Sequence, residues 1–352
     1  MVPFTLTERR DELIMSTKII SIGYKFPPFR VTNEIWQEQF APKTQLMSNE
    51  FTRFISEGVE QRFYMMPGDT VDELAAQAAL DCLRRIDFPP EEVEHIIHMA
   101  NVPDTLVNGE GPKIQHRIGA TRASTIDITG VSCVGFILGL NMAVSLIESG
   151  CYNNVLISCV ANVGTRAADH RDVSAATLGD LATAVLVQKT DAPVGKLGFV
   201  HQTRGQYYHV HVHKVVEDGK RTWQEDEKRH WGKHFFYIDP RKGVPAAKEG
   251  AQEFAPMVAR LALERAGKTI DDVKWFITHQ PGAAPMKVWD KLLGIDKEIH
   301  PNTLSEIGNS SFCTIPFTLL RTIEKGAIKD EDIILFLTPS SGQHAAALVW
   351  KW

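Results

Sequence analysis

Three short segments, far apart in the sequence, carry side chains that could act together in acyl transfer. Cys133 stands in the segment DITGVSCVGF, at the start of a long apolar stretch. A thiol at the start of a helix lies near unpaired N–H groups and the positive end of the helix dipole, which stabilise a thiolate. The other segments are HQPG at His279 and GNSS at Asn309, which we expect in polar loops at strand or helix ends. Taken singly, each residue also has a structural interpretation, because most cysteines are inert core residues.

The elements around these segments indicate an α/β protein. Residues 124–128 and 154–160 predict strands, and residues 131–149 predict a helix that is apolar nearly all round. Such a helix belongs inside a protein. Continuous apolar strands belong in sheets that are covered on both faces. We therefore expect a helix between two sheets.

The second half of the chain repeats this layout. The units Gly130–Gly150 and Gly308–Gly326 each enclose a predicted helix, and they span 20 and 18 residues. This weak internal duplication predicts two similar halves that face each other. We divide the chain into an N-terminal extension (1–17), a first half with Cys133 (18–192) and a second half with His279 and Asn309 (193–352).

The composition argues against several classes of protein. Hydrophobic residues make up 43% and charged residues 23%, as in soluble globular proteins and unlike disordered chains. The net charge of -5, from 38 basic and 43 acidic residues, comes without a basic stripe, which argues against a nucleic-acid binder. The longest mostly apolar stretch, residues 133–147, is shorter than the ~20 residues of a membrane-spanning helix. Residues 1–16 lack the apolar region of a secretory signal, so we expect a cytoplasmic protein.

Neither the cysteines nor the histidines predict a metal site. The 5 cysteines are an odd number without a C-x-x-C pair, which argues against a disulfide framework and for a reducing compartment. His209, His211 and His213 alternate, so a strand here would place three imidazoles on one face. We favour a solvated edge strand over a zinc site, because no cysteine or carboxylate stands at a matching spacing. We expect no metal and no cofactor.

The three segments, in this order, resemble those of the β-ketoacyl-ACP synthase III group of the thiolase superfamily. That group carries a cysteine in A-C-x-G-F, a histidine in H-Q-A-N and an asparagine in G-N-T-S, which appear here as SCVGF, HQPG and GNSS. The spacing of 30 residues from His279 to Asn309 is usual for the group. Residues 178–180 (LGD) are similar to its F-G-D-G segment, and residues 340–342 (SSG) stand where its glycine-rich loop does.

The resemblance implies a five-layered αβαβα thiolase fold of two duplicated halves, a dimer and a ping-pong reaction. The Cys133 thiolate would attack an acyl thioester, and the backbone N–H groups of Cys133 and Gly342 would hold the oxyanion. His279 and Asn309 would then donate hydrogen bonds to the thioester oxygen of a malonyl-type extender as it loses CO2. Its carbanion would attack the acyl-enzyme. The implied partners are thioesters of acyl carrier protein or coenzyme A, with no other cofactor.

Several positions depart from the pattern of the group. The arginine five residues after the histidine is Ala284 here, and Phe51 replaces a tryptophan that often stacks on the adenine of coenzyme A. Ser341 stands in a loop where glycines are usual. Val107 lies in a loop similar to one that reaches the tunnel of the neighbouring subunit, and its size favours a longer or bulkier acyl group. We expect Phe51, Val107 and Ser341 to contact the substrate. Because of these departures, we predict a specialised relative of the group that acts in natural-product assembly.

A basic surface could receive the acidic carrier protein. Lys287 and Lys291 stand four residues apart after HQPG, so a helix would place them on one face. In relatives of the group the docking surface draws on this helix, and a locally basic surface would attract an acidic carrier. An ordinary solvated helix face is the competing interpretation.

Two other functions stay open from the sequence. One is an acyltransferase of the same fold that moves the acyl group to an oxygen, nitrogen or carbon nucleophile without decarboxylation. The other is a non-catalytic partner subunit of a heterodimeric synthase. Asn309 favours decarboxylative condensation over the first, and the presence of Cys133, His279 and Asn309 together argues against the second.

Overall fold

Two mixed β-sheets form the framework of the molecule. The computed structural model describes residues 16–39, 57–168, 173–214, 216–217, 220–221, 235–238, 249–340 and 343–352. The first sheet has the strand order β1-β7-β6-β4-β5, and the second has the order β13-β14-β15-β8. The strands of the first sheet are β1 (Ser16–Lys25), β4 (His95–Ala100), β5 (Ser124–Ile128), β6 (Asn154–Ala161) and β7 (Leu181–Thr190). Those of the second are β8 (Gly195–Thr203), β13 (Val273–Thr278), β14 (Ile333–Ser340) and β15 (His344–Lys351).

The two sheets repeat one topology. In the first sheet β7 lies antiparallel between β1 and β6, and β6 continues parallel to β4. In the second, β15 lies antiparallel between β8 and β14, and β14 continues parallel to β13. The strand order therefore corresponds strand by strand, with β5 as an additional edge strand in the first sheet. This repeat agrees with the duplication expected from the glycine-bounded units.

The chain passes from one sheet to the other between Thr190 and Gly195, and the expected boundary after residue 192 falls within this connection. At the other end, β1 begins at Ser16 and not at residue 18. Ser16 and Thr17 pair with Thr190 and Lys189 of β7, so the last two residues of the expected extension belong to the sheet. Residues 1–15 lie outside the described residues.

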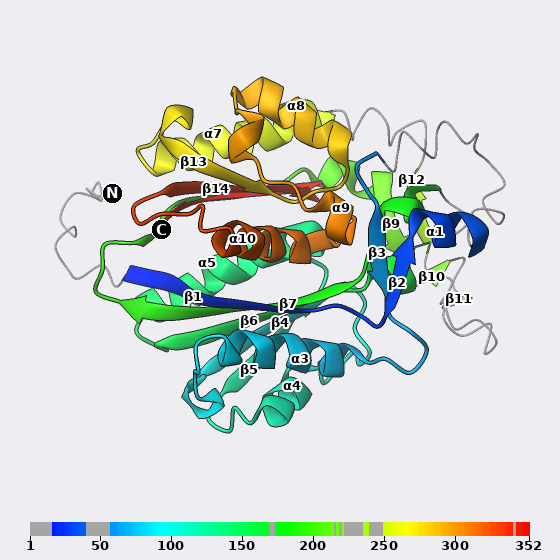
Figure 1. The fold of residues 1–352 in the computed structure, drawn as a ribbon, viewed down its shortest axis with the longest axis horizontal. Coiled ribbons are helices and arrows are strands. Elements are labelled where there is room, and N and C mark those ends of the chain that lie inside the picture. The colour runs from blue at the N-terminus through cyan, green and yellow to red at the C-terminus, as the bar shows by residue number, and fades with distance from the viewer. Residues whose placement is uncertain are drawn as a thin grey trace, which may run out of the picture.

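Helices and sheets alternate in five layers (Figure 1). α3 (Val71–Arg84) and α4 (Gly111–Ile118) cover the outer face of the first sheet, and α7 (Ala255–Arg265) and α8 (Ala283–Leu293) cover that of the second. α5 (Gly135–Glu148) and α10 (Thr314–Glu324) lie between the sheets. This is the αβαβα thiolase fold that the resemblance implied.

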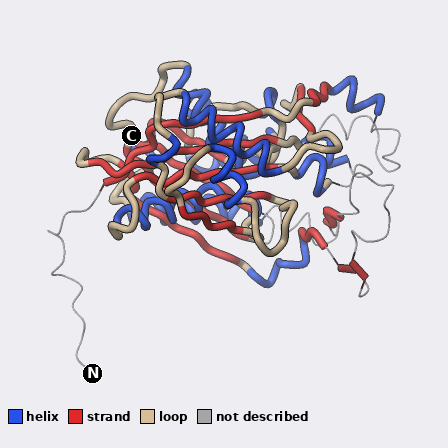
Figure 2. The backbone as a smooth tube through the Cα atoms, turned by 90° about the horizontal axis from the view of Figure 1, so that it is seen from below, coloured by secondary structure: helices blue, strands red, loops and turns tan. Residues whose placement is uncertain are grey.

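Shorter elements lie beside these layers, at the end of the molecule opposite to the C-terminus in both Figure 1 and Figure 2. They are β2 (Phe29–Thr32), α1 (Asn33–Gln39), β3 (Gln61–Tyr64), β9 (His211–Lys214), β10 (Val216–Glu217), β11 (Lys220–Arg221) and β12 (Phe235–Ile238). A further short α-helix, α9 (Leu304–Ile307), precedes the second polar loop of the chain's C-terminal half. In the part of the chain that the structure describes, no helix combines the length and apolarity needed to cross a bilayer.

The alternating histidines do not share one strand. His209 belongs to a 3₁₀ turn at Gly205–Val210, and only His211 and His213 lie in β9, which pairs with β12. The expectation of three imidazoles on one strand face is therefore wrong. The alternation of residue types suited a strand, but the backbone turns before the second histidine.

The central core explains why α5 is apolar over most of its surface. Buried residues of α5, α10 and the inner faces of both sheets form one cluster, which includes Phe136, Leu140, Phe317 and Phe336. The helix is shorter than expected at its start, because Ser132–Val134 form a 3₁₀ turn before α5. The positive φ of 73° at Gly130 and 45° at Ser132 prevents a continuous α-helix from residue 131.

Gly23 allows close contact between β1 and α3, and its replacement tests this packing. A Cβ atom at this position would lie 2.1 Å from the Cys82 amide nitrogen and 2.5 Å from the Ala78 carbonyl oxygen. Both are backbone atoms, so the strand or the helix must move. We expect Gly23→Ala to lower the free energy of unfolding by about 3 kcal/mol, measured by urea denaturation. Gly205→Ala is the control, since no atom lies within 4 Å of its added Cβ. Equal effects of the two changes would contradict the close contact.

Candidate active site

The two inner helices and one strand of the second sheet bring the three chemical segments together. Cys133 lies in the 3₁₀ turn before α5, and His279 directly follows β13. Asn309 lies just before a second 3₁₀ turn, at Ser311–Cys313, which leads into α10. Ser311 contacts all three residues, through its hydroxyl, its carbonyl oxygen and its amide. The site therefore lies between the halves of the molecule and uses both.

The two 3₁₀ turns have the same unusual backbone. Ser132 has a φ of 45° and Ser311 a φ of 48°, and each follows a glycine with positive φ, Gly130 or Gly308. A non-glycine residue in this region is uncommon, and such residues cluster at functional sites. The repeat of this conformation at the start of α5 and α10 is part of the internal duplication. It presents the residues of both turns at the centre of the molecule.

Cys133 is held by hydrogen bonds from both turns. The hydroxyl groups of Ser311 and Ser132 donate to its Sγ, at 3.5 and 3.8 Å. Its carbonyl oxygen accepts from Thr338 Oγ1 at 3.3 Å, which ties the turn to the end of β14. Burial raises the pKa of the thiol, but His279 and the hydrogen bonds outweigh burial and lower the pKa to about 7. A substantial fraction is therefore thiolate at neutral pH.

His279 is buried and has a defined orientation. Its side chain is 3% exposed, and its backbone N–H donates to the Leu337 carbonyl at 3.0 Å. Its Nδ1 lies 3.1 Å from the Ser311 carbonyl oxygen. Because a carbonyl only accepts, Nδ1 carries a proton, and Nε2 is the ring nitrogen available for the reaction. The charge and hydrogen bond of this ring favour the thiolate of Cys133.

Asn309 is fixed by its backbone as well as its side chain. Its Oδ1 accepts from the Ser311 N–H at 3.1 Å, which leaves the side-chain NH2 as a donor for a ligand. Its backbone N–H donates to the Thr177 carbonyl, and its carbonyl accepts from the Gly179 N–H at 3.0 Å. The LGD segment of residues 178–180 therefore holds Asn309 in place. Its last residue, Asp180, is buried and accepts from the N–H groups of Met65 and Gly164.

The other thiols lack this environment. Burial raises the pKa of Cys82 and of Cys313 to about 12, and it also raises that of Cys159. Cys151 is exposed on the surface, beyond the end of α5. Burial thus raises the pKa of the three buried thiols, whereas the pKa of Cys133 is lowered.

The remaining expected site residues divide into two groups. Phe51, Ser341 and Gly342 lie outside the described residues, so the substrate and oxyanion roles expected of them stay predictions. Val107 is 94% exposed in the loop before α4 and does not line the site within this chain. Lys287 and Lys291 are both exposed on α8. The Lys287 Nζ lies 2.9 Å from Glu57 Oε1, so this expected docking lysine has an acidic neighbour.

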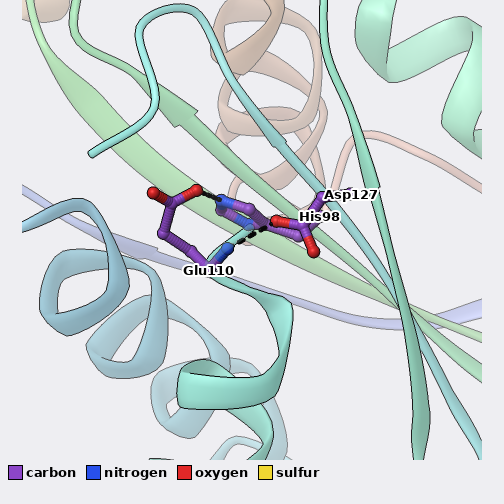
Figure 3. A group of neighbouring side chains, drawn as sticks. All are labelled: His98, Glu110 and Asp127. Atoms are coloured by element: carbon purple, nitrogen blue, oxygen red, sulfur yellow. Dashed lines mark hydrogen bonds and ion pairs between the residues drawn. The ribbon is translucent and has the colours of Figure 1, made fainter. Parts of the chain in front are cut away.

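A polar cluster near the Val107 loop, buried at two of its three residues, was not expected from the sequence (Figure 3). It comprises His98 of β4, Glu110 at the start of α4 and Asp127 of β5, whose potential ligand atoms lie within 4.8 Å of one another. His98 Nε2 is 4.0 Å from Glu110 Oε2, and burial lowers the pKa of this histidine to about 4. The ring is therefore neutral at pH 7.

This cluster has a structural role that its contacts define. Asp127 Oδ1 accepts from the N–H groups of Glu110 and Gly111, at 2.7 and 3.1 Å, and so caps α4. Glu110 Oε1 accepts from the N–H and the hydroxyl of Thr105, at 2.7 and 3.0 Å. The carboxylates that could bind a metal are thus occupied in fixing the loop that carries Val107. Of these residues only Asp127 stood out in the sequence, as part of the segment around Cys133.

Comparison with known proteins gives one consistent family. Residues 126–205 match the family described as 3-oxoacyl-[acyl-carrier-protein (ACP)] synthase III, and residues 263–352 match the family described as its C-terminal part. The β-ketoacyl-[acyl-carrier-protein] synthase III of Microcystis aeruginosa is 28% identical over 329 residues, which cover 89% of this chain and 95% of that protein.

Solved structures agree with this result. The β-ketoacyl-[acyl carrier protein] synthase III of Thermus thermophilus has a TM-score of 0.81 at 25% identity, covering 95% of this chain and 98% of that one. The priming β-ketosynthase of the R1128 polyketide biosynthetic pathway has a TM-score of 0.83 at 22% identity, covering 97% and 98%. The second likeness shows a shared fold.

The lowered thiol pKa can be tested by alkylation. Because the thiolate reacts, the rate of iodoacetamide labelling at Cys133 should rise as the pH passes upward through about 7. His279→Ala removes the main group that favours the thiolate, so the midpoint should move up and labelling at pH 7 should fall roughly five- to tenfold. Peptide mass spectrometry separates Cys133 from Cys151, whose labelling is the internal control. An unchanged midpoint in the variant would contradict the His279 contribution.

Proposed function

Since this chain is a β-ketoacyl-acyl carrier protein synthase III-like member of the thiolase superfamily, we propose that it is a condensing enzyme with Cys133 as its nucleophile. The reaction joins an acyl group from a thioester to a malonyl-type thioester, with loss of CO2. One observation carries the proposal: a cysteine with a pKa of about 7 shares the neighbour Ser311 with His279 and Asn309. This arrangement suits a covalent acyl intermediate followed by stabilisation of a second oxyanion.

In the first half-reaction Cys133 accepts the acyl group. Its thiolate attacks the carbonyl carbon of the donor thioester, and the carrier thiolate leaves and takes up a proton. The backbone N–H of Cys133 lies at the start of α5, where unpaired N–H groups favour the negative charge of the tetrahedral intermediate. Gly342 is proposed as the second donor from the resemblance alone.

In the second half-reaction the malonyl-type thioester loses CO2 and becomes an enolate. When Nε2 carries a proton as well as Nδ1, His279 would donate through Nε2 to its thioester oxygen, beside the side-chain NH2 of Asn309. The enolate carbon then attacks the acyl carbonyl, and Cys133 leaves as the thiolate. The available amide of Asn309 supports this route over acyl transfer without decarboxylation, and it argues against a non-catalytic subunit.

The substrate proposal remains broad. The acyl and extender groups would arrive on acyl carrier protein or coenzyme A, with no further cofactor. The departures at Ala284 and Phe51 concern features that bind the primer coenzyme A, so we propose a specialised enzyme of natural-product or fatty-acid-related synthesis. Val107 does not line the site of its own chain, so its small side chain would leave room for a longer or bulkier acyl group in the tunnel of a neighbouring subunit.

We also propose a dimer that covers the exposed edge of the first sheet. β5 is the edge strand, and Ile126 in its middle is 41% exposed. The nearby loop before α4 exposes Leu106 and Val107 by 73% and 94%. An exposed edge with apolar neighbours is usually covered in a native protein. A second copy of this chain is the expected partner, and a related subunit is the alternative.

The five free cysteines support a reducing, cytoplasmic compartment.

Asn309→Ala should separate the two half-reactions. The variant should load acyl groups on Cys133 nearly as fast as the wild type, since its side chain faces the extender. Condensation should fall roughly a hundredfold, the usual effect of losing one oxyanion donor. Intact-protein mass spectrometry follows loading, and release of CO2 from a malonyl thioester follows condensation. Cys133→Ala is the control and should gain no acyl mass.

Other outcomes of this experiment identify the alternatives. Acyl loading of the wild type without CO2 release would indicate an acyltransferase without decarboxylation. No acyl mass with any donor would indicate a non-catalytic subunit. Equal losses of both steps in Asn309→Ala would show that Asn309 acts through the turn before α10.

The docking proposal predicts a salt-dependent change in KM. Charge reversal at Lys287 and Lys291 should raise the apparent KM for a carrier-bound substrate, more at low salt than at high salt. A small pantetheine thioester should react as before. The matched control reverses Lys274 and Lys325, which are both exposed. Lys274 lies at the end of β13 that is far from His279, and Lys325 lies at the end of α10 that is far from Asn309. The proposal is wrong if both pairs act alike, or if the small substrate responds as much as the carrier-bound one.

A further inference from the structure

The nucleophile has a hydrogen-bond relay behind it that the proposed mechanism does not use. We propose that Ser311 is a further catalytic residue, whose hydroxyl donates to the Cys133 thiolate, and that Asn101 is the positioning residue that orients this hydroxyl. The inference deepens the proposed function and rests on Cys133 as the nucleophile. Ser311 is the last residue of the GNSS segment, in which only Asn309 was expected to act, and Asn101 lies outside all three segments.

The first step of the relay is the contact with sulfur. Ser311 Oγ lies 3.5 Å from Cys133 Sγ, and Ser311 is 2% exposed. A hydrogen bond to the charged form of a thiol favours that form. In a buried setting the hydroxyl replaces the water that would otherwise solvate the thiolate, and the low dielectric strengthens the interaction.

The second step sets the direction of the hydroxyl proton. Asn101 directly follows β4, and its Nδ2 lies 3.2 Å from Ser311 Oγ. An amide NH2 only donates, so in this orientation the serine oxygen accepts from Asn101 and its proton is directed to the sulfur. A chain of donors aligned in this way also polarises the terminal hydroxyl. With the amide reversed, Ser311 would donate to Asn101 and the sulfur would lose this donor.

The backbone of Ser311 makes its own hydrogen bonds, so the role of its side chain can be tested separately. Its N–H donates to Asn309 and its carbonyl accepts from His279, as described above. Its φ of 48° is a conformation that glycine adopts without strain. Ser311→Gly therefore removes the hydroxyl while leaving the turn and both backbone contacts in place. Ser132 offers a matched control, because it has a φ of 45° and its hydroxyl also lies near the sulfur, at the longer distance of 3.8 Å.

The test is the pH dependence of iodoacetamide labelling at Cys133 in the full chain. We expect Ser311→Gly to move the midpoint up by about one unit, so that labelling at pH 7 falls roughly fivefold while the plateau at high pH stays unchanged. Ser132→Gly should move it clearly less. Asn101→Ala should move it in the same direction as Ser311→Gly. The double variant should not exceed Ser311→Gly alone, because both changes interrupt one relay.

Each other outcome overturns the inference. An unchanged midpoint in Ser311→Gly shows that the hydroxyl does not donate to the sulfur. If the midpoint shifts equally in Ser311→Gly and Ser132→Gly, the effect comes from the turns and not from the relay. If the shifts of Ser311→Gly and Asn101→Ala add up in the double variant, Asn101 is not part of the relay. Labelling needs no acyl substrate, so the relay can fail while acyl loading persists, and the proposed function can fail while the midpoints shift as expected.

Discussion

Burial of α5 and α10 between the two sheets is the constraint on which the site depends. The buried faces of both helices belong to one continuous apolar core, whereas Ser145 of α5 and Glu324 of α10 are exposed. The buried faces of these helices cannot carry polar side chains without partners, because burying an unpaired polar group is costly. Polar chemistry is therefore confined to the helix ends, where unpaired N–H groups also favour negative charge. The N-terminal turns of α5 and α10 supply Cys133 and Ser311 in this way.

The internal duplication includes two such turns, which share a backbone conformation but differ in their residues. Ser132 and Ser311 share a left-handed backbone. The residue after Ser132 is the proposed nucleophile Cys133, whereas the residue after Ser311 is Phe312, which is 1% exposed and lies in the central core. One turn thus presents a thiol and the other supports it with a hydroxyl and two backbone groups. The two sheets have also diverged, because only the first has a fifth strand, β5, at its edge.

The cysteines show how much the neighbours of a buried group matter. Cys133 and Cys313 lie in the corresponding turns of the two halves, yet burial raises the pKa of Cys313 to about 12 while that of Cys133 falls to about 7. Burial disfavours the thiolate at both positions, although Cys133 is partly and Cys313 fully buried. The difference comes from partners: Cys133 has a histidine and serine hydroxyls, whereas the Cys313 Sγ donates to the Leu181 carbonyl at 3.2 Å. Partners, more than position alone, decide which thiol is reactive.

The sequence by itself determined the class of fold, the duplication and the three motif residues. Apolar periodicity depends on residues near each other in the chain, so the strands and inner helices could be predicted, and the order of the motifs indicated the family. Tertiary structure alone decided what surrounds Cys133. Ser311 lies 178 residues from it, and Asn101 lies 210 residues from Ser311, so no local pattern could link them. The same holds for His98 and Glu110, and for the acidic neighbour of Lys287. Such contacts arise only when the layers pack, because packing and not sequence spacing brings these side chains within hydrogen-bond distance.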